Sequence, residues 1–151
     1  VLTSGSRKAS SLNKPVYSSS ITNQGLVQVS GVSKPVNTVK SVLLVSGIAN
    51  PSRFKDAMSK DFTVLEHTEF SDHHAYSRTD IELLLKKIDS FGTSADAVVI
   101  TEKDAARLAN TQLLDILKDT PVFYLRISLG FDPKDAEEFE KLIVDNGKYV
   151  R

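Results

Sequence analysis

The chain contains no cysteine, no excess of charge of either sign and no long apolar run. The absence of cysteine excludes a disulfide framework, a thiolate metal site and a cysteine nucleophile. Lys plus Arg number 19, as do Asp plus Glu, so nothing indicates a surface for nucleic acid or a polybasic membrane anchor. Apolar stretches stay below the roughly 20 residues that span a bilayer, and no signal peptide is recognisable. What remains is the composition of one ordinary globular domain, with 151 residues of which 40% are apolar and 25% charged.

The first forty residues differ in character from the rest. They are rich in serine, are interrupted by Asn, Gly and Pro, and show no helical period. Residues 1–13 are predicted to be loop. Two short strands are predicted at 16–21 and 26–29, joined by a hairpin turn at 23–25. We therefore expect residues 1–40 to form a loop and β-ribbon linker that leans on another domain or on the main sheet.

From Ser41 onward, apolar strand patterns alternate with helical ones. Asn50 and Pro51 are typical of a helix start, and residues 79–82 have capping-box spacing. Strands are predicted at 41–46, 62–67, 95–100 and 121–127, and helices at 51–60, 79–91, from 101, at 112–118 and from 132. Such alternation is typical of βαβ units with right-handed crossovers. The sequence therefore predicts a Rossmann-like three-layer α/β lobe at 41–151 with a mainly parallel four-stranded sheet, preceded by the short β-ribbon.

Ligands of an open parallel sheet bind beyond the carboxyl ends of its strands. The second strand is followed by Asp72, His73 and His74, the sharpest chemical feature of the chain. A histidine beside a carboxylate can act as a general base or contact a phosphate, and the three side chains can also ligate a metal. A polar loop with an aspartate cap is the plain alternative. The third histidine, His67, is predicted to be structural.

The third strand is followed by a charged helix start, Thr101 to Asp104. Lys103 there can meet a phosphate, helped by free N–H groups and the helix dipole. The alternative is a helix cap with a local ion-pair network that includes Arg107. The turn after the first strand, at 47–51, can also direct N–H groups toward an anion, but no P-loop pattern G-x-x-x-x-G-K-[ST] occurs in the chain.

Four stretches with consistent spacing carry a family resemblance. They are LLVSGIANP at 43–51, FSDHHAY at 70–76, ITEKDAARL at 100–108 and PVFYL at 121–125. Together they resemble the C-terminal half of the tetraacyldisaccharide 4'-kinases, the lipid A 4'-kinases, from about Lys14 to Arg151. The family's F-x-D-H element matches Phe70, Asp72 and His73.

The resemblance implies an ATP-dependent kinase of lipid A biosynthesis. Such an enzyme transfers the γ-phosphate to the 4'-hydroxyl of a lipid A disaccharide precursor, with Mg²⁺, at the cytoplasmic face of the inner membrane of Gram-negative bacteria. The resemblance places the P-loop, the metal ligands and the membrane-associating helix in an N-terminal lobe of the same polypeptide. Because the chain lacks the P-loop and begins with Val1, we expect a soluble fragment without a membrane span that is inactive alone.

The same resemblance implies roles for individual residues. His73 is implied to be catalytic or to contact a phosphate, with Asp72 orienting it. A supporting role at the nucleotide or interlobe site falls to His74, Thr101, Glu102, Lys103 and Asp104. No metal ligand is assigned to this chain, since Mg²⁺ and ATP are expected to be bound mainly by the N-terminal lobe.

Two readings from other functional classes stay open. A metal-dependent phosphoesterase is suggested by the Asp-His-His string, although the other strands end in Gly47, Thr101 and Ser128 rather than in carboxylates. A non-catalytic α/β interaction module is the other alternative. Full activity of the intact protein after His73→Ala would favour the module, whereas tight Mn²⁺ binding with phosphodiester hydrolysis would favour the phosphoesterase.

Overall fold

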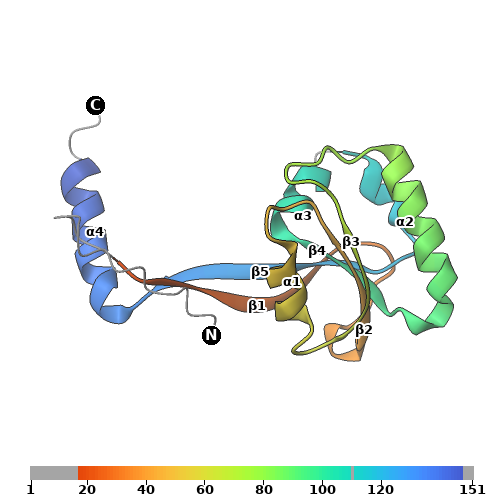
Figure 1. Cartoon of the computed structure of the whole chain (residues 1–151), viewed down its shortest axis with the longest axis horizontal. Coiled ribbons are helices and arrows are strands. Elements are labelled where there is room, and N and C mark those ends of the chain that lie inside the picture. Colours follow the sequence, from red (N-terminus) through yellow and green to blue (C-terminus); the bar gives the residue numbers. More distant parts are fainter. Residues whose placement is uncertain (1–16, 110, 148–151) are drawn as a thin grey trace. The chain divides into compact units, whose positions relative to one another are not determined.

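The computed structural model describes residues 17–109 and 111–147, so the predicted loop at 1–13 lies outside the described residues. The chain divides into two compact units, residues 24–126 and residues 1–23 with 127–151. Figure 1 labels the α-helices and the strands. The elements in chain order are β1 (Ser19–Ser30), η1 (Val36–Thr38), β2 (Ser41–Ser46), α1 (Pro51–Met58), β3 (Thr63–Glu69), α2 (Arg78–Phe91), η2 (Gly92–Ser94), β4 (Ala97–Thr101), α3 (Glu102–Ala109), η3 (Leu113–Leu117), β5 (Val122–Phe131) and α4 (Pro133–Gly147). No helix among these described segments is long and apolar enough to cross a bilayer.

The sheet has five strands in the order β1-β5-β4-β2-β3. Strand β2 pairs in parallel with β3 on one side and with β4 on the other, and β4 pairs in parallel with β5. The predicted α/β fold with a mainly parallel sheet is confirmed. The connection through α1 leads from β2 to the strand on one side, whereas β4 and β5 follow on the other side. The direction of winding therefore reverses between β2 and β4, which is the position where ligands of such sheets bind.

Helices cover both faces of the sheet in the unit of residues 24–126. On one face, Leu44 and Val99 pack with Phe54 and Met58 of α1. On the other, Leu43 and its neighbours pack with the apolar sides of α2, α3 and η3. Strands β2 and β4 are buried on both faces, because successive side chains of a strand point to opposite sides and each side meets a helix. This arrangement is the predicted three-layer packing.

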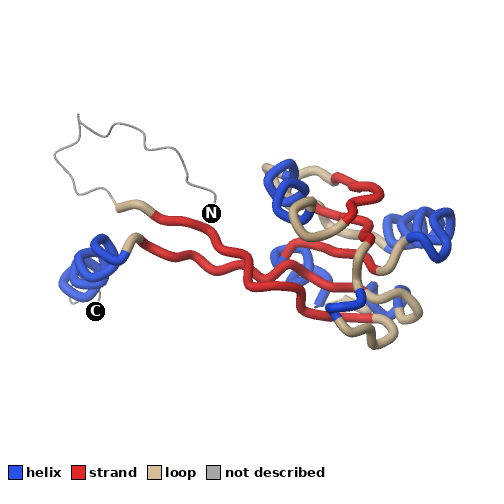
Figure 2. Tube along the Cα trace, turned by 90° about the horizontal axis from the view of Figure 1, so that it is seen from below, coloured by secondary structure: helices blue, strands red, loops and turns tan. Residues whose placement is uncertain are grey.

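The predicted β-hairpin in the N-terminal part is wrong. Residues 19–30 form one continuous strand, and Gly25 has a φ of 90° within it rather than at a turn. Figure 2 shows β1 running beside β5, which is itself longer than predicted and ends at Phe131. The Ser18 carbonyl accepts from Asp132 N, and Thr22 Oγ1 lies 2.7 Å from Ser128 Oγ, so the two strands are antiparallel here. Pairing with a long partner outweighs the local turn signal, and the sheet gains a fifth strand.

Two helix starts and one helix also differ from the sequence prediction. Helix α2 begins after Ser77, whose side chain accepts from Asp80 N while the Asp80 carboxylate accepts from Ser77 N, so the capping box lies two residues earlier than predicted. At α1, Pro51 is at the first turn as expected, but Asn50 makes no side-chain cap and instead accepts from Ser52 Oγ. The helix predicted at 112–118 is the 3₁₀ helix η3.

Candidate functional site

A buried carboxylate joins the carboxyl ends of β2 and β4. Asp104, in the first turn of α3, is 0% exposed. Its Oδ2 accepts from Gly47 N at 3.0 Å and from Thr101 Oγ1 at 2.6 Å, and its Oδ1 accepts from Arg107 Nη1 at 2.8 Å. These donors compensate for the loss of water around the charge. The contacts fix the residue after β2 to the start of the helix that follows β4.

Arg107 lies one helical turn after Asp104 and extends this network outward. Its Nη1 also donates to the Gly47 carbonyl at 2.8 Å, and its Nη2 lies 3.2 Å from His73 Nδ1. A guanidinium group donates hydrogen bonds and never accepts them. In this contact His73 Nδ1 can only accept.

His73 presents an exposed ring on a constrained backbone. Its side chain is 78% exposed. It is the one non-glycine residue of the described ranges with a positive φ, 60°. Its N–H donates to Asp72 Oδ1 at 3.0 Å and approaches the Gly47 carbonyl at 3.3 Å. The left-handed conformation costs about 1–2 kcal/mol for an L-residue, so these contacts and Arg107 hold the residue where a glycine would sit more easily.

Asp72 contacts His73 mainly through the backbone. Its Oδ2 is 3.7 Å from His73 Nε2, beyond hydrogen-bond length but within ion-pair range. The carboxylate therefore stabilises the turn through the His73 N–H and adds negative charge beside Nε2.

His74, by contrast, belongs to the support of the loop. Its ring stacks on Phe70 with centroids 4.4 Å apart, and its Nε2 lies 3.0 Å from Asp80 Oδ2 at the start of α2. Hydrogen bonds from Ser77, with a smaller contribution from His74, lower the pKa of Asp80. The ionised carboxylate thus anchors the loop of residues 70–76 to the N-terminus of α2.

The hydroxyl of Tyr76 is buried beside Gly47 and the Asp104 carboxylate. Burial first of all, and then the negative charge of Asp104, raise the pKa of Tyr76, so the phenol stays protonated. A Cβ on Gly47 would lie 3.3 Å from both Tyr76 Oη and Asp104 Oδ1. The absence of a side chain at residue 47 is therefore what lets these groups approach the backbone.

Comparison with known proteins identifies the family. The family model described as tetraacyldisaccharide-1-P 4'-kinase matches residues 2–146. The chain belongs to this family. Proteins named tetraacyldisaccharide 4'-kinase from Phocaeicola vulgatus and Parabacteroides distasonis are each 33% identical, over 118 and 111 residues. Those alignments cover 78% and 74% of this chain but 31% and 30% of the relatives, so the chain spans about a third of the length of the relatives it matches.

A solved structure shares the fold. The crystal structure of an apo form of LpxK from Aquifex aeolicus in complex with ATP matches with a TM-score of 0.53 and 20% identity, covering 89% of this chain and 37% of that one. At this identity the match supports the α/β fold seen in Figure 1.

The residues that the tetraacyldisaccharide 4'-kinase motifs point to fall into two groups. The structure brings together Asp72, His73, Thr101 and Asp104 around Gly47. Glu102 is half-buried and Lys103 is exposed at the start of α3. His74 turns toward α2.

Sequence reasoning missed the central position of Arg107 and the closeness of Tyr76 to Asp104. Arg107 entered only as a member of a possible ion-pair network. Its i, i+3 spacing from Asp104 on α3 is the signal that indicates a shared helix face.

His67 is a packed residue, as predicted. Its side chain is 3% exposed, and its Nε2 lies 2.8 Å from Ser46 Oγ, itself fully buried at the end of β2. Its Nδ1 has no hydrogen-bond partner among the described residues and is 3.4 Å from Glu69 Oε1. Burial, the largest effect, lowers the pKa of His67.

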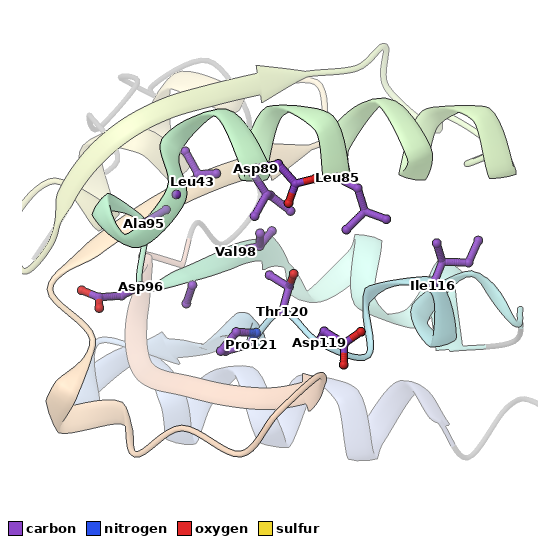
Figure 3. A pocket seen from close by; sticks show the side chains of 13 residues that line it. Leu43, Leu85, Asp89, Ala95, Asp96, Val98, Ile116, Asp119, Thr120 and Pro121 are labelled. Atoms are coloured by element: carbon purple, nitrogen blue, oxygen red, sulfur yellow. The ribbon is translucent and has the colours of Figure 1, made fainter.

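A cavity of about 440 Å³ lies at the other end of the strands (Figure 3). Its lining is mixed, with apolar side chains such as Leu85, Val98 and Ile116 and the carboxylates of Asp89 and Asp119. None of the site residues that the resemblance implies, which are Asp72, His73, His74 and residues 101–104, lines it. Within the described ranges, no group of three His, Asp or Glu side chains is arranged to hold a metal ion.

Proposed function

We propose that this chain is the C-terminal lobe of an ATP-dependent kinase that phosphorylates the 4'-hydroxyl of a lipid A disaccharide precursor. We further propose that the lobe is inactive alone. Membership of the tetraacyldisaccharide-1-P 4'-kinase family supports the reaction. The observation that carries the proposal for this lobe is the exposed ring of His73, whose Nδ1 lies 3.2 Å from Arg107 Nη2 at the winding reversal of the sheet.

Phosphoryl transfer depends on positioning and on stabilising charge rather than on covalent chemistry from the protein. In this arrangement His73 offers Nε2–H to a phosphate or to the group that activates the hydroxyl, and Arg107 adds a fixed positive charge behind it. Asp72 holds the backbone of His73. His74, Thr101, Glu102, Lys103 and Asp104 serve the nucleotide or interlobe site by supporting the two loops that form it.

The nucleotide and its metal are assigned to another part of the polypeptide. The chain has no P-loop pattern, and the described residues offer no cluster of three metal-ligating side chains. We therefore propose that an N-terminal P-loop lobe of the same polypeptide binds Mg²⁺ and the ATP phosphates, at the cytoplasmic face of a Gram-negative inner membrane where the lipid precursor is presented.

A chimaera tests the function. This chain replaces the matching segment of the Phocaeicola vulgatus tetraacyldisaccharide 4'-kinase, and transfer of labelled γ-phosphate to the lipid disaccharide is measured. We expect product from the chimaera, none from this chain alone, and a loss of at least about 100-fold in kcat for His73→Ala, the range of a lost acid–base or charge-stabilising group.

The control is Glu82→Gln, which removes an exposed ion pair with Arg78 on α2 and leaves the site intact. Turnover of the His73→Ala chimaera within twofold of its parent would contradict the proposed role and favour an interaction module. Turnover by the isolated chain would contradict its inactivity. Titration of the ¹⁵N-labelled chain with ATP, followed at the Gly47 and His73 amides, tests the nucleotide contact even where the chimaera folds poorly.

A further inference from the structure

We propose that Arg107 is a positioning residue for His73: it holds the imidazole in the tautomer protonated on Nε2 and fixes the loop of residues 72–74 against the end of β2. The inference rests on the proposed function for its catalytic meaning, but its structural part stands on the contacts of this chain alone.

The guanidinium of Arg107 bonds to groups from separate segments. Nη1 donates to Asp104 Oδ1 and to the Gly47 carbonyl, both at 2.8 Å. The remaining amino group, Nη2, is the one that meets His73 Nδ1. One planar group thus connects α3, the end of β2 and the loop after β3, and its fixed fork sets the direction in which each bond can form.

The orientation of this fork is set by a carboxylate that has little room to move. Asp104 is fully buried and is itself held by Gly47 N and Thr101 Oγ1. The side chain of Arg107 is 25% exposed, whereas the His73 ring that it contacts is 78% exposed. The exposed ring of His73 is therefore oriented from the protein interior.

The tautomer follows from the chemistry of the pair. Arg107 remains protonated and supplies only donors. As long as Nη2 donates to His73 Nδ1, that nitrogen carries no proton, and the neutral ring has its hydrogen on Nε2. His73 then acts on a ligand as a hydrogen-bond donor through Nε2.

Lysine cannot replace Arg107 in this role. A single ammonium nitrogen can keep the ion pair with Asp104, but it lacks the second amino group that reaches His73. Arg107→Lys therefore separates the stabilising function of the charge from the positioning of the imidazole.

The test is NMR of this chain with ¹⁵N-labelled histidine at a pH where the ring is neutral. In the wild-type protein we expect His73 Nδ1 at the limiting shift of an unprotonated nitrogen, Nε2 at that of a protonated one, and a scalar coupling across the Arg107–His73 hydrogen bond. In Arg107→Lys the two ring shifts move toward each other as both tautomers become populated. Unchanged His67 and His74 ring signals, from the other histidines of the chain, show that the variant is folded.

A protonated Nδ1 in the wild-type protein, or identical tautomer populations in wild type and Arg107→Lys, would overturn the inference. If Arg107→Lys fails to fold, the scalar coupling across the Arg107–His73 hydrogen bond in the wild-type protein tests the inference: its presence supports the bond and its absence contradicts it. In the chimaera, we expect Arg107→Lys to lower kcat about 10- to 100-fold, the scale of a misplaced catalytic group, with KM for ATP changed less than threefold. In the His73→Ala chimaera, the additional substitution Arg107→Lys should lower kcat little further, because the imidazole that it positions is already absent.

The outcomes of the two proposals can be told apart. A lost tautomer preference in Arg107→Lys, with normal turnover of the His73→Ala chimaera, keeps Arg107 as the positioning residue and removes the catalytic role of His73. An inactive His73→Ala chimaera beside a fully active Arg107→Lys chimaera keeps the proposed function and removes the positioning role.

Discussion

Replacement of Asp104 by Asn should destabilise the fold more than any substitution of an exposed charge. The carboxylate is 0% exposed and accepts from Gly47 N, Thr101 Oγ1 and Arg107 Nη1. Asparagine keeps the shape but has one carbonyl oxygen, so its NH₂ group must face either Arg107 or the pair of Gly47 and Thr101 donors. Removing one partner of a buried ion pair costs about 3–5 kcal/mol.

The lower end of that range applies because Arg107 is 25% exposed and regains water. A loss of about 3 kcal/mol corresponds to a fall in Tm of about 6–12 °C, at about 2–4 °C per kcal/mol for a chain of this size. Urea unfolding followed by far-UV circular dichroism measures the change. The control, Glu82→Gln, breaks an exposed pair and should cost about 0.3–0.5 kcal/mol. A loss below about 1 kcal/mol for Asp104→Asn, with an unchanged m value, would refute the idea that this carboxylate holds the two strand ends together.

Three further predictions concern other parts of the fold. Gly31→Ala should lower the free energy of unfolding in urea by at least about 2 kcal/mol more than Gly25→Ala does. Both glycines have a positive φ, but only a Cβ at residue 31 would meet a backbone atom, the Thr120 carbonyl oxygen at 1.7 Å. Equal losses of free energy in the two variants would contradict the clash. Burial lowers the pKa of His67 from 6.5, so the unfolded chain binds more protons below that value and the free energy of unfolding should fall as the pH drops from about 7.5. His67→Gln should reduce this slope, by at most about 1.4 kcal/mol per pH unit, and an unchanged slope in stability titrations would refute the assignment. Asp96 accepts a hydrogen bond from Lys34, and this bond is the main cause that lowers its carboxyl pKa below the usual 3.8. The stability that the ionised carboxylate adds is therefore present above that pH and is lost as the pH falls through the pKa of the folded state. In acid unfolding followed by circular dichroism, Asp96→Asn should lack this loss of stability, and an acid transition identical to that of the wild type would contradict the prediction.

The central elements of the fold were predictable because their signals are local. Residues 41–46 and 95–100 are short apolar runs, and such runs are typical of strands covered on both faces. The structure buries β2 and β4 completely or nearly so. Pro51 likewise marks the start of α1 through its fixed φ and missing N–H.

The N-terminal strand was predicted wrongly because its partner is distant in sequence. The segment Asn23 to Gly25 carries a real turn signal, yet β1 continues through it beside β5, about a hundred residues later along the chain. The helix start at Ser77 shows a related limit. Two overlapping capping patterns begin at Ser77 and Thr79, and the His74 contact with Asp80 favours the earlier one.

The sequence predicted which loops form the candidate site, but not the hydrogen bonds that join those loops. The rule that ligands bind beyond the carboxyl ends of parallel strands directed attention to Asp72, His73 and the start of α3. Strand order was needed to bring these segments together, since β4 lies beside β2 although β3 precedes it in the chain. The strand order places the start of α3 beside the end of β2, and there Arg107 rather than Lys103 contacts His73.

Gly47 explains why the site is built around a charged pair. The strand ends at Ser46, so the N–H and the carbonyl of the next residue need partners outside the ladder. Asp104 accepts from the N–H, Arg107 donates to the carbonyl, and the His73 N–H approaches the same carbonyl. An Asp and an Arg at i, i+3 satisfy both backbone groups and neutralise each other. The pair that completes the strand end is thus the pair that orients the exposed imidazole, and stability and positioning at this site depend on the same hydrogen bonds.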